Sequence, residues 1–179
     1  MKKLLNLKSN TTLFLACAAM LTVILAQTFA QNMHNEFLRA PLSPFSQVPS
    51  ILAPSTGQFE AQVNNDGTIS FALSYANMSS AVTQAHIHFG ASLTNGGVMV
   101  FLCGGAKPAC PASGTISGTL TAADVSILPA TNSDSVIPQG IQPNDLAAML
   151  SAIRSGNTYV NVHTVNFPNG EIRGQVQVR

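Results

Sequence analysis

The feature that most constrains the fold of this 179-residue chain is a series of short strand-like segments, most of which alternate apolar with polar residues. They span residues 59–63, 69–75, 81–90, 98–103, 114–120, 159–165 and 171–178. A period of two places successive side chains on opposite faces of a β-strand. Turn sequences such as Asn95-Gly96-Gly97 and Asn169-Gly170 separate the segments, as in antiparallel hairpins. The chain is therefore predicted to be mostly β, an antiparallel Greek-key β-sandwich or barrel.

Two stretches carry helical signals and are predicted to form short helices in the connections between strands. Residues 121–128 open with Thr121, followed three places later by Asp124, which is close to a capping box. Residues 144–156 place apolar residues at helical spacing and end on a glycine, where a C-terminal cap belongs. The intervening residues 129–142 are predicted to be a surface loop.

The first thirty residues have the layout of a secretory signal peptide. Lysines at positions 2, 3 and 8 precede an almost wholly apolar run over residues 13–26, and a small-x-small cleavage pattern follows at residues 28–30. An uncleaved N-terminal anchor is the alternative, although the run is short for a membrane span. Residues 31–56 are rich in proline and polar residues, and are predicted to be a flexible segment before a domain at residues 57–179. The expected location is the periplasm or the medium.

Removing residues 1–30 takes away three of the eight basic residues and none of the seven acidic ones, so the net charge changes from +1 to −2. Without a basic patch, the chain is not expected to bind nucleic acid, nor a membrane other than through its signal peptide. Cys103 and Cys110 are the cysteines that remain. In an oxidising compartment they are predicted to form a disulfide across a short loop, because a thiolate metal site would need more ligands.

Two of the four histidines, His86 and His88, flank a single isoleucine. Because Ile87 belongs to the core face of its strand, both histidines are predicted to face away from the core. The same argument for Val162 turns His163 outward on another strand. Three imidazoles suit copper or zinc and leave a fourth position for water or substrate. The competing interpretation is that these are ordinary surface histidines, and a single sequence does not say whether their strands are neighbours.

Four further side chains, Tyr159, Asn161, Glu171 and Arg173, have the outward phase and are candidates for a polar ligand groove. Glu171 is expected to pair with Arg173 on one strand face. No catalytic residue is assigned, because neither a serine-hydrolase elbow nor a phosphate-binding loop is present in the sequence. The sequence therefore favours a protein that is not an enzyme.

The stretches QAHIHFG, GTISGTLTAADV and YVNVHTVNFPNGEIRGQV resemble the chordin-type (CHRD) domain family of secreted proteins. The resemblance covers Ser55 to Val178 and implies a secreted, β-rich domain. In chordin-like animal proteins such domains accompany growth-factor-binding modules, and in bacterial proteins their role is mostly undefined. The sequence has no cysteine-rich binding module, so growth-factor antagonism is not carried over.

A fainter likeness is to the copper/zinc superoxide dismutases, Greek-key sandwiches with an H-x-H strand motif and a later strand histidine. His86, His88 and His163 match that order and phase. The sequence has no match for the bridging histidine, the zinc-binding cluster or the active-site arginine of that family. The likeness therefore implies a shared architecture with a residual copper site rather than dismutase activity.

Two functional hypotheses follow from these observations. The first is an exported CHRD-domain protein that acts as a binding or cell-surface module for an unknown protein or glycan ligand. The second is a metalloprotein that binds copper or zinc through His86, His88 and His163, with redox activity as a further option.

Overall fold

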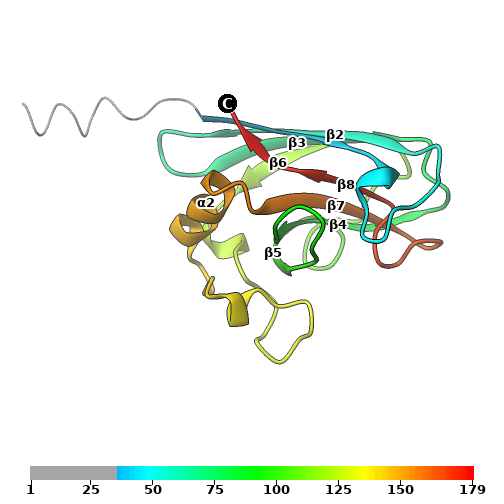
Figure 1. Cartoon of the computed structure of the whole chain (residues 1–179). Helices are drawn as coiled ribbons and strands as arrows, with labels where there is room; N and C mark the ends of the chain where they lie inside the picture. The colour runs from blue at the N-terminus through cyan, green and yellow to red at the C-terminus, as the bar shows by residue number, and fades with distance from the viewer. Residues whose placement is uncertain (1–35) are drawn as a thin grey trace, which may run out of the picture. The chain divides into compact units, whose positions relative to one another are not determined.

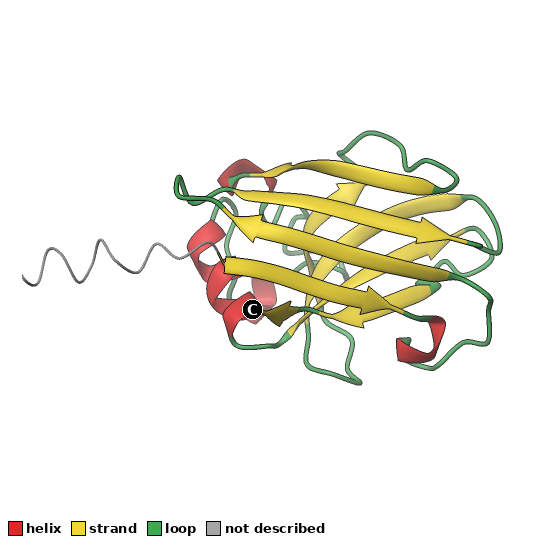
Figure 2. Ribbon diagram, turned by 90° about the horizontal axis from the view of Figure 1, so that it is seen from above, coloured by secondary structure: helices red, strands yellow, loops and turns green. Residues whose placement is uncertain are grey.

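The computed structural model describes residues 36–179, which form two packed antiparallel sheets (Figure 1). The five-stranded sheet has the order β6-β3-β2-β1-β9, and the four-stranded sheet has the order β5-β4-β7-β8. Figure 2 views the two layers of strands from above. The strands are β1 (Glu36–Leu42), β2 (Thr56–Val63), β3 (Ile69–Ala76), β4 (Val82–Phe89), β5 (Gly97–Cys103), β6 (Gly114–Leu120), β7 (Thr158–Thr164), β8 (Ile172–Gln175) and β9 (Gln177–Val178). The predicted β-sandwich is confirmed, in its open form rather than as a closed barrel.

Strand β1 lies within the segment predicted to be flexible, so that prediction is wrong for residues 36–42. The strand pairs with β2 along its whole length and with β9 at Leu38 and Arg39. Its inward-facing residues are Leu38, Ala40 and Leu42, none of which is more than 4% exposed. Pro41 takes an outward position in this alternation, although a proline in the sequence argues against a strand. Proline is tolerated there because β9 pairs with β1 only as far as Arg39.

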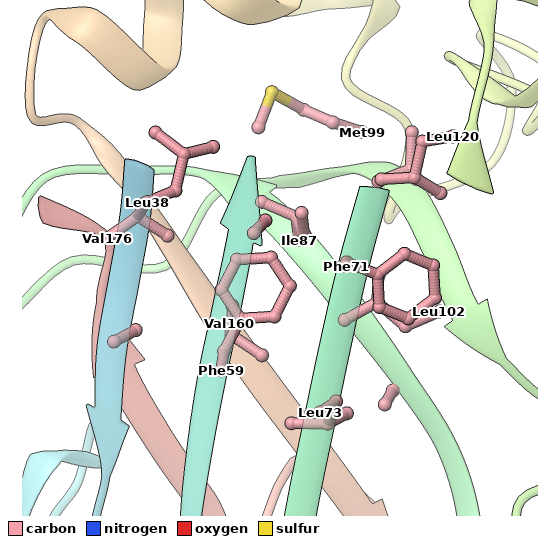
Figure 3. Close-up of a cluster of buried hydrophobic side chains, with 14 of the residues drawn as sticks. Leu38, Phe59, Phe71, Leu73, Ile87, Met99, Leu102, Leu120, Val160 and Val176 are labelled. Atoms are coloured by element: carbon pink, nitrogen blue, oxygen red, sulfur yellow. The ribbon is translucent and has the colours of Figure 1, made fainter. Parts of the chain in front are cut away.

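The core lies between the two sheets and is built from alternate residues of their facing sides. Figure 3 shows Phe59 and Leu73 of the larger sheet in one cluster with Ile87 and Val160 of the smaller sheet. None of these four side chains is more than 1% exposed. Burying a side chain of this kind contributes about 1.5–3 kcal/mol, so this cluster holds the sheets together and fixes which strand faces point outward.

Helix α2 (Leu146–Arg154) confirms the second helical prediction and lies at one end of the sandwich (Figures 1 and 2). The Asp145 side chain caps the helix by accepting a hydrogen bond of 2.9 Å from the backbone N–H of Ala148. Met149 and Ile153 bury its apolar side in the core.

The predicted helix at residues 121–128 is wrong in extent, because only the 3-10 turn η2 (Ala122–Asp124) forms there. The capping box between Thr121 and Asp124 is present. Ser126 then adopts a left-handed φ of 53°, and its backbone N–H donates to the carbonyl of Met99 in β5. This contact with the sheet replaces the next turn of the helix.

The remaining connections hold the 3-10 turns η1 (Pro44–Ser46) and η3 (Ile137–Gln139). Cys103 and Cys110 form the predicted disulfide, with their Cα atoms 5.1 Å apart. Within residues 36–179, no helix combines the length and apolar character needed to cross a membrane. The predicted signal peptide, residues 1–30, lies outside the described residues.

Candidate metal centre

The outer face of the four-stranded sheet carries the three histidines singled out in the sequence. The register of β4 with β7 pairs His86 with Asn161, His88 with Tyr159, and Gln84 with His163. The two strands are therefore neighbours, which the sequence alone did not say. The predicted phase is confirmed, since Ile87 between His86 and His88, and Val162 next to His163, face the core and are at most 1% exposed.

The interpretation of these residues as surface histidines is wrong, because His86 is 3% exposed and His88 and His163 are each 7% exposed. Connections between strands cover this face of the sheet. The residues that they contribute around the histidines are Asn95, Gly96, Asp134, Pro168 and Asn169. Strand phase predicts which face a side chain takes, but not what covers that face.

One ring nitrogen of each histidine lies within 4.8 Å of those of the other two. The Nδ1 atoms of His88 and His163 are each 2.9 Å from a backbone carbonyl oxygen, that of Gly96 and that of Pro168 respectively. A carbonyl oxygen only accepts hydrogen bonds, so each Nδ1 carries the proton and each Nε2 keeps a free lone pair. Both Nε2 atoms, and both ring nitrogens of His86, are buried without a hydrogen-bond partner among residues 36–179.

Burial governs the protonation of all three rings. It lowers the pKa of His86 to about 2, with a further lowering by His163 and His88, because a charge on one ring disfavours a charge on the next. Burial likewise lowers the pKa of His88 to about 4 and lowers the pKa of His163. The rings are therefore neutral at physiological pH, which is the form in which imidazole binds a metal.

Aromatic contacts fix the orientation of two of the rings. His86 packs edge-on against Phe101, with ring centroids 4.4 Å apart. His88 stacks on Tyr159 at 4.7 Å, with the ring planes 3° apart. The guanidinium carbon of Arg173 lies 3.4 Å from the centre of the same Tyr159 ring, so Tyr159 contacts both Arg173 and His88.

Arg173 also holds the loop that orients His88. Its guanidinium donates hydrogen bonds to the carbonyl oxygens of Ala91 and Thr94 and to the side-chain oxygen of Asn95. The next residue, Gly96, supplies the carbonyl oxygen that holds Nδ1 of His88. Arg173 therefore acts on the histidine cluster indirectly, through the loop and through Tyr159.

The predicted pairing of Glu171 with Arg173 is wrong. Glu171 precedes β8, so the alternation of that strand does not govern its side chain, and the carboxylate accepts hydrogen bonds from Ser79 and Thr164 instead. Burial raises the pKa of Glu171, but the hydrogen bonds from Thr164 and Ser79 outweigh it and hold the pKa below its ordinary value. Glu171 thus ties together two connections at the edge of the sheet.

The histidines line a pocket of about 200 Å³. Tyr159 and Asn161 of the predicted polar groove also line it, whereas Glu171 and Arg173 are not among its described lining residues. Asn161 is held by Gln47, whose side-chain amide donates a 2.7 Å hydrogen bond to its Oδ1. Since a water molecule occupies about 30 Å³, the pocket has room for a metal ion together with a few water-sized ligands.

Sequence reasoning missed the backbone carbonyls of Gly96 and Pro168 and the side chain of Asp134. The nearest signals were the turn sequences at residues 95–97 and 169–170. These predicted reversals of the chain, but not that carbonyl oxygens of the turns face back onto the sheet.

Comparison with known proteins identifies the family of the chain. The model of the CHRD domain family matches residues 38–176, nearly all of the described part of the chain. No curated protein and no solved structure matches the chain. The family match includes the three histidines and both disulfide cysteines, and it confirms the resemblance seen in the sequence. The chain belongs to the CHRD domain family.

Proposed function

We propose that this CHRD domain binds one copper or zinc ion through the Nε2 atoms of His88 and His163 and a ring nitrogen of His86. The observation that carries the proposal is the convergence of buried ring nitrogens that have no hydrogen-bond partner among the described residues. A buried polar group left unpaired costs about 1–3 kcal/mol, so these nitrogens favour a guest in the pocket that can pair with them. A bound ion offsets that cost, because each ligating lone pair then has a partner.

The surroundings of the rings also suit a metal. Metal-ligating histidines commonly donate their other ring N–H to a backbone carbonyl or carboxylate, which fixes the tautomer and the ring orientation. His88 and His163 make such bonds to Gly96 and Pro168. Neutral imidazoles favour copper or zinc over calcium or magnesium, which prefer oxygen ligands. Three protein ligands leave a position for water or a small molecule, as in sites that exchange ligands.

Metal content measured by mass spectrometry on untagged protein, before and after loading with copper or zinc, tests the proposal. About one ion per chain is expected in the wild type, and a small fraction of that in His88→Ala or His163→Ala. His34→Ala removes the fourth histidine and is the matched control, expected to retain the ion. No stoichiometric metal in the wild type would overturn the proposal and direct the search to protein or glycan partners. With copper bound, redox assays become worthwhile.

We also propose that the protein is exported and works as a binding or cell-surface module. The disulfide between Cys103 and Cys110 supports this, because such bonds persist in oxidising compartments, and the signal-like pattern of residues 1–30 agrees with it. N-terminal sequencing of protein recovered outside the cytoplasm is expected to start near Gln31. A chain that keeps residues 1–30 and stays in the cytoplasm would contradict export.

A further inference from the structure

The connection between η2 and α2 brings a carboxylate to the histidine pocket. Asp134 is the one acidic residue among the described residues that line this pocket. It is exposed, whereas the three histidines are buried, so it lies where the pocket meets solvent.

The backbone fixes the position of Asp134 against the sheet. Val98 of β5 donates its N–H to the carbonyl oxygen of Asp134 at 2.7 Å, and Ser135 forms a parallel bridge with Val98. Val98 is in turn paired with His88 in β4. His88, Val98 and Ser135 therefore lie side by side across neighbouring strands, in one cross-strand row. The close approach requires Gly97, because a Cβ there would lie 2.6 Å from the carbonyl oxygen of Ser135.

The side chains of Asp134 and Ser135 have different surroundings. The Ser135 hydroxyl donates to the carbonyl oxygen of Leu128, and Ser135 is buried away from the pocket lining. The Asp134 carboxylate has neither a hydrogen bond nor an ion pair with any other residue in the range 36–179, where the ion pairs are Lys107–Asp124 and Arg154–Glu36. It is therefore free to interact with a molecule in the pocket.

We propose that Asp134 accepts a hydrogen bond from the water at the open position of the bound metal ion, and so makes the site prefer divalent ions to Cu(I). This inference rests on the proposed metal-binding function. The carboxylate acts through a water rather than as a fourth ligand, because its oxygens are not among the ligand atoms that lie within 4.8 Å of one another. A hydrogen bond to a carboxylate is shorter and stronger than one between neutral groups.

The charges around the pocket explain the preference. The three neutral imidazoles add no charge. The Arg173 cation packs on the ring of Tyr159, which stacks on His88, and Arg173 is not among the described residues that line the pocket. A divalent ion therefore enters a site whose only nearby negative charge, among the described lining residues, is Asp134. Coulomb attraction to that carboxylate is proportional to the charge of the ion. Removing the carboxylate therefore changes the binding free energy of a divalent ion about twice as much as that of a monovalent ion. The fold-change in affinity for the divalent ion is then about the square of the fold-change for the monovalent ion.

The test measures Zn(II) and Cu(I) affinities of untagged wild-type protein and Asp134→Asn by competition with chelators. Loss of an outer-shell partner weakens metal binding about 10–100-fold, so that range is expected for Zn(II) and about 3–10-fold for Cu(I). Asparagine has almost the same shape at this exposed position, so the fold is retained, which circular dichroism checks. Glu60→Gln, an equal change of charge on β2 of the other sheet, is the matched control and is expected to bind as the wild type does.

The outcomes separate the two proposals. A wild type that binds neither ion contradicts the metal-binding function, and this inference with it. If the wild type binds both ions and the Zn(II) affinity of Asp134→Asn is within twofold of that of the wild type, the role of Asp134 is overturned. The proposed histidine site is then still supported. Equal losses for Zn(II) and Cu(I) overturn the role of Asp134 too. The absorption spectrum of bound Co(II) gives a second readout. It is expected to change in Asp134→Asn, because the water at the fourth position then loses its hydrogen bond to the carboxylate, and an unchanged spectrum overturns the role of Asp134.

Discussion

Replacing His86 with leucine separates a ligand-binding role from a structural one. His86 is buried, and neither of its ring nitrogens has a hydrogen-bond partner within the described part of the chain. A side chain kept for packing would have its polar atoms satisfied. If His86 is instead kept to bind a metal, the metal-free protein should become more stable when an apolar side chain of similar size replaces it.

The size of the gain follows from two opposing effects. Leaving a buried polar group unpaired costs about 1–3 kcal/mol, and leucine removes both nitrogens at once. The substitution also loses the edge-on contact of His86 with Phe101, and aromatic pairs of this kind contribute about 0.5–1.5 kcal/mol. Counting the imidazole as one unpaired group, the midpoints of the two ranges are about 2 and about 1 kcal/mol. The expected net stabilisation is therefore about 1 kcal/mol, which raises the melting temperature of a domain of this size by about 3 °C.

Thermal unfolding in the presence of a chelator measures this directly. Ile87→Val is the matched control, because Ile87 is the next residue of β4, faces the core and is 1% exposed. It is expected to lose about 0.5–1.5 kcal/mol. Added zinc should raise the melting temperature of the wild type and not that of His86→Leu. A metal-free His86→Leu protein that is less stable than the wild type by more than about 1 kcal/mol would show instead that His86 stabilises the fold without a metal.

Two further substitutions probe the residues that support the site. Arg173→Met should weaken zinc binding about 10-fold or more in chelator competition, because it releases the loop whose Gly96 carbonyl holds His88; an unchanged affinity would speak against this positioning role. Glu171→Gln should reduce the free energy of unfolding by about 1–3 kcal/mol at neutral pH, since the lowered pKa of Glu171 means that the fold favours the ionised form. The stability that ionised Glu171 contributes is present above its ordinary pKa of 4.5 and is lost as pH falls through its lower pKa in the folded state. Denaturant unfolding should therefore show that the difference in free energy of unfolding between wild type and variant becomes smaller at acid pH. A difference that stays constant down to the acid transition would contradict the assignment.

The orientation of the three histidines could be predicted because it depends on local alternation. Ile87 and Val162 had to face the core, and their neighbours on each strand therefore faced the other way. The disulfide could be predicted as well, since Cys103 and Cys110 are close in sequence. Strand β1 was missed because Pro41 hid an otherwise regular alternation.

The burial of the histidines could not be predicted, because it depends on where the loops lie. The loop after β4 is held by Arg173 from β8, and the connection that contains Asp134 is held by its backbone contact with Val98. These contacts join residues far apart in the chain and leave no periodic signal. The same limit applies to Glu171, whose partner Ser79 lies 92 positions away in the sequence.

X-ray absorption on the zinc-loaded protein tests most directly whether three imidazoles hold one ion. About three imidazole nitrogens at about 2.0–2.1 Å and one further light atom are expected, and this signal should be lost when His86 is replaced by leucine. A ligand shell made mainly of oxygen, or a spectrum that is the same in His86→Leu, would contradict the three-histidine site.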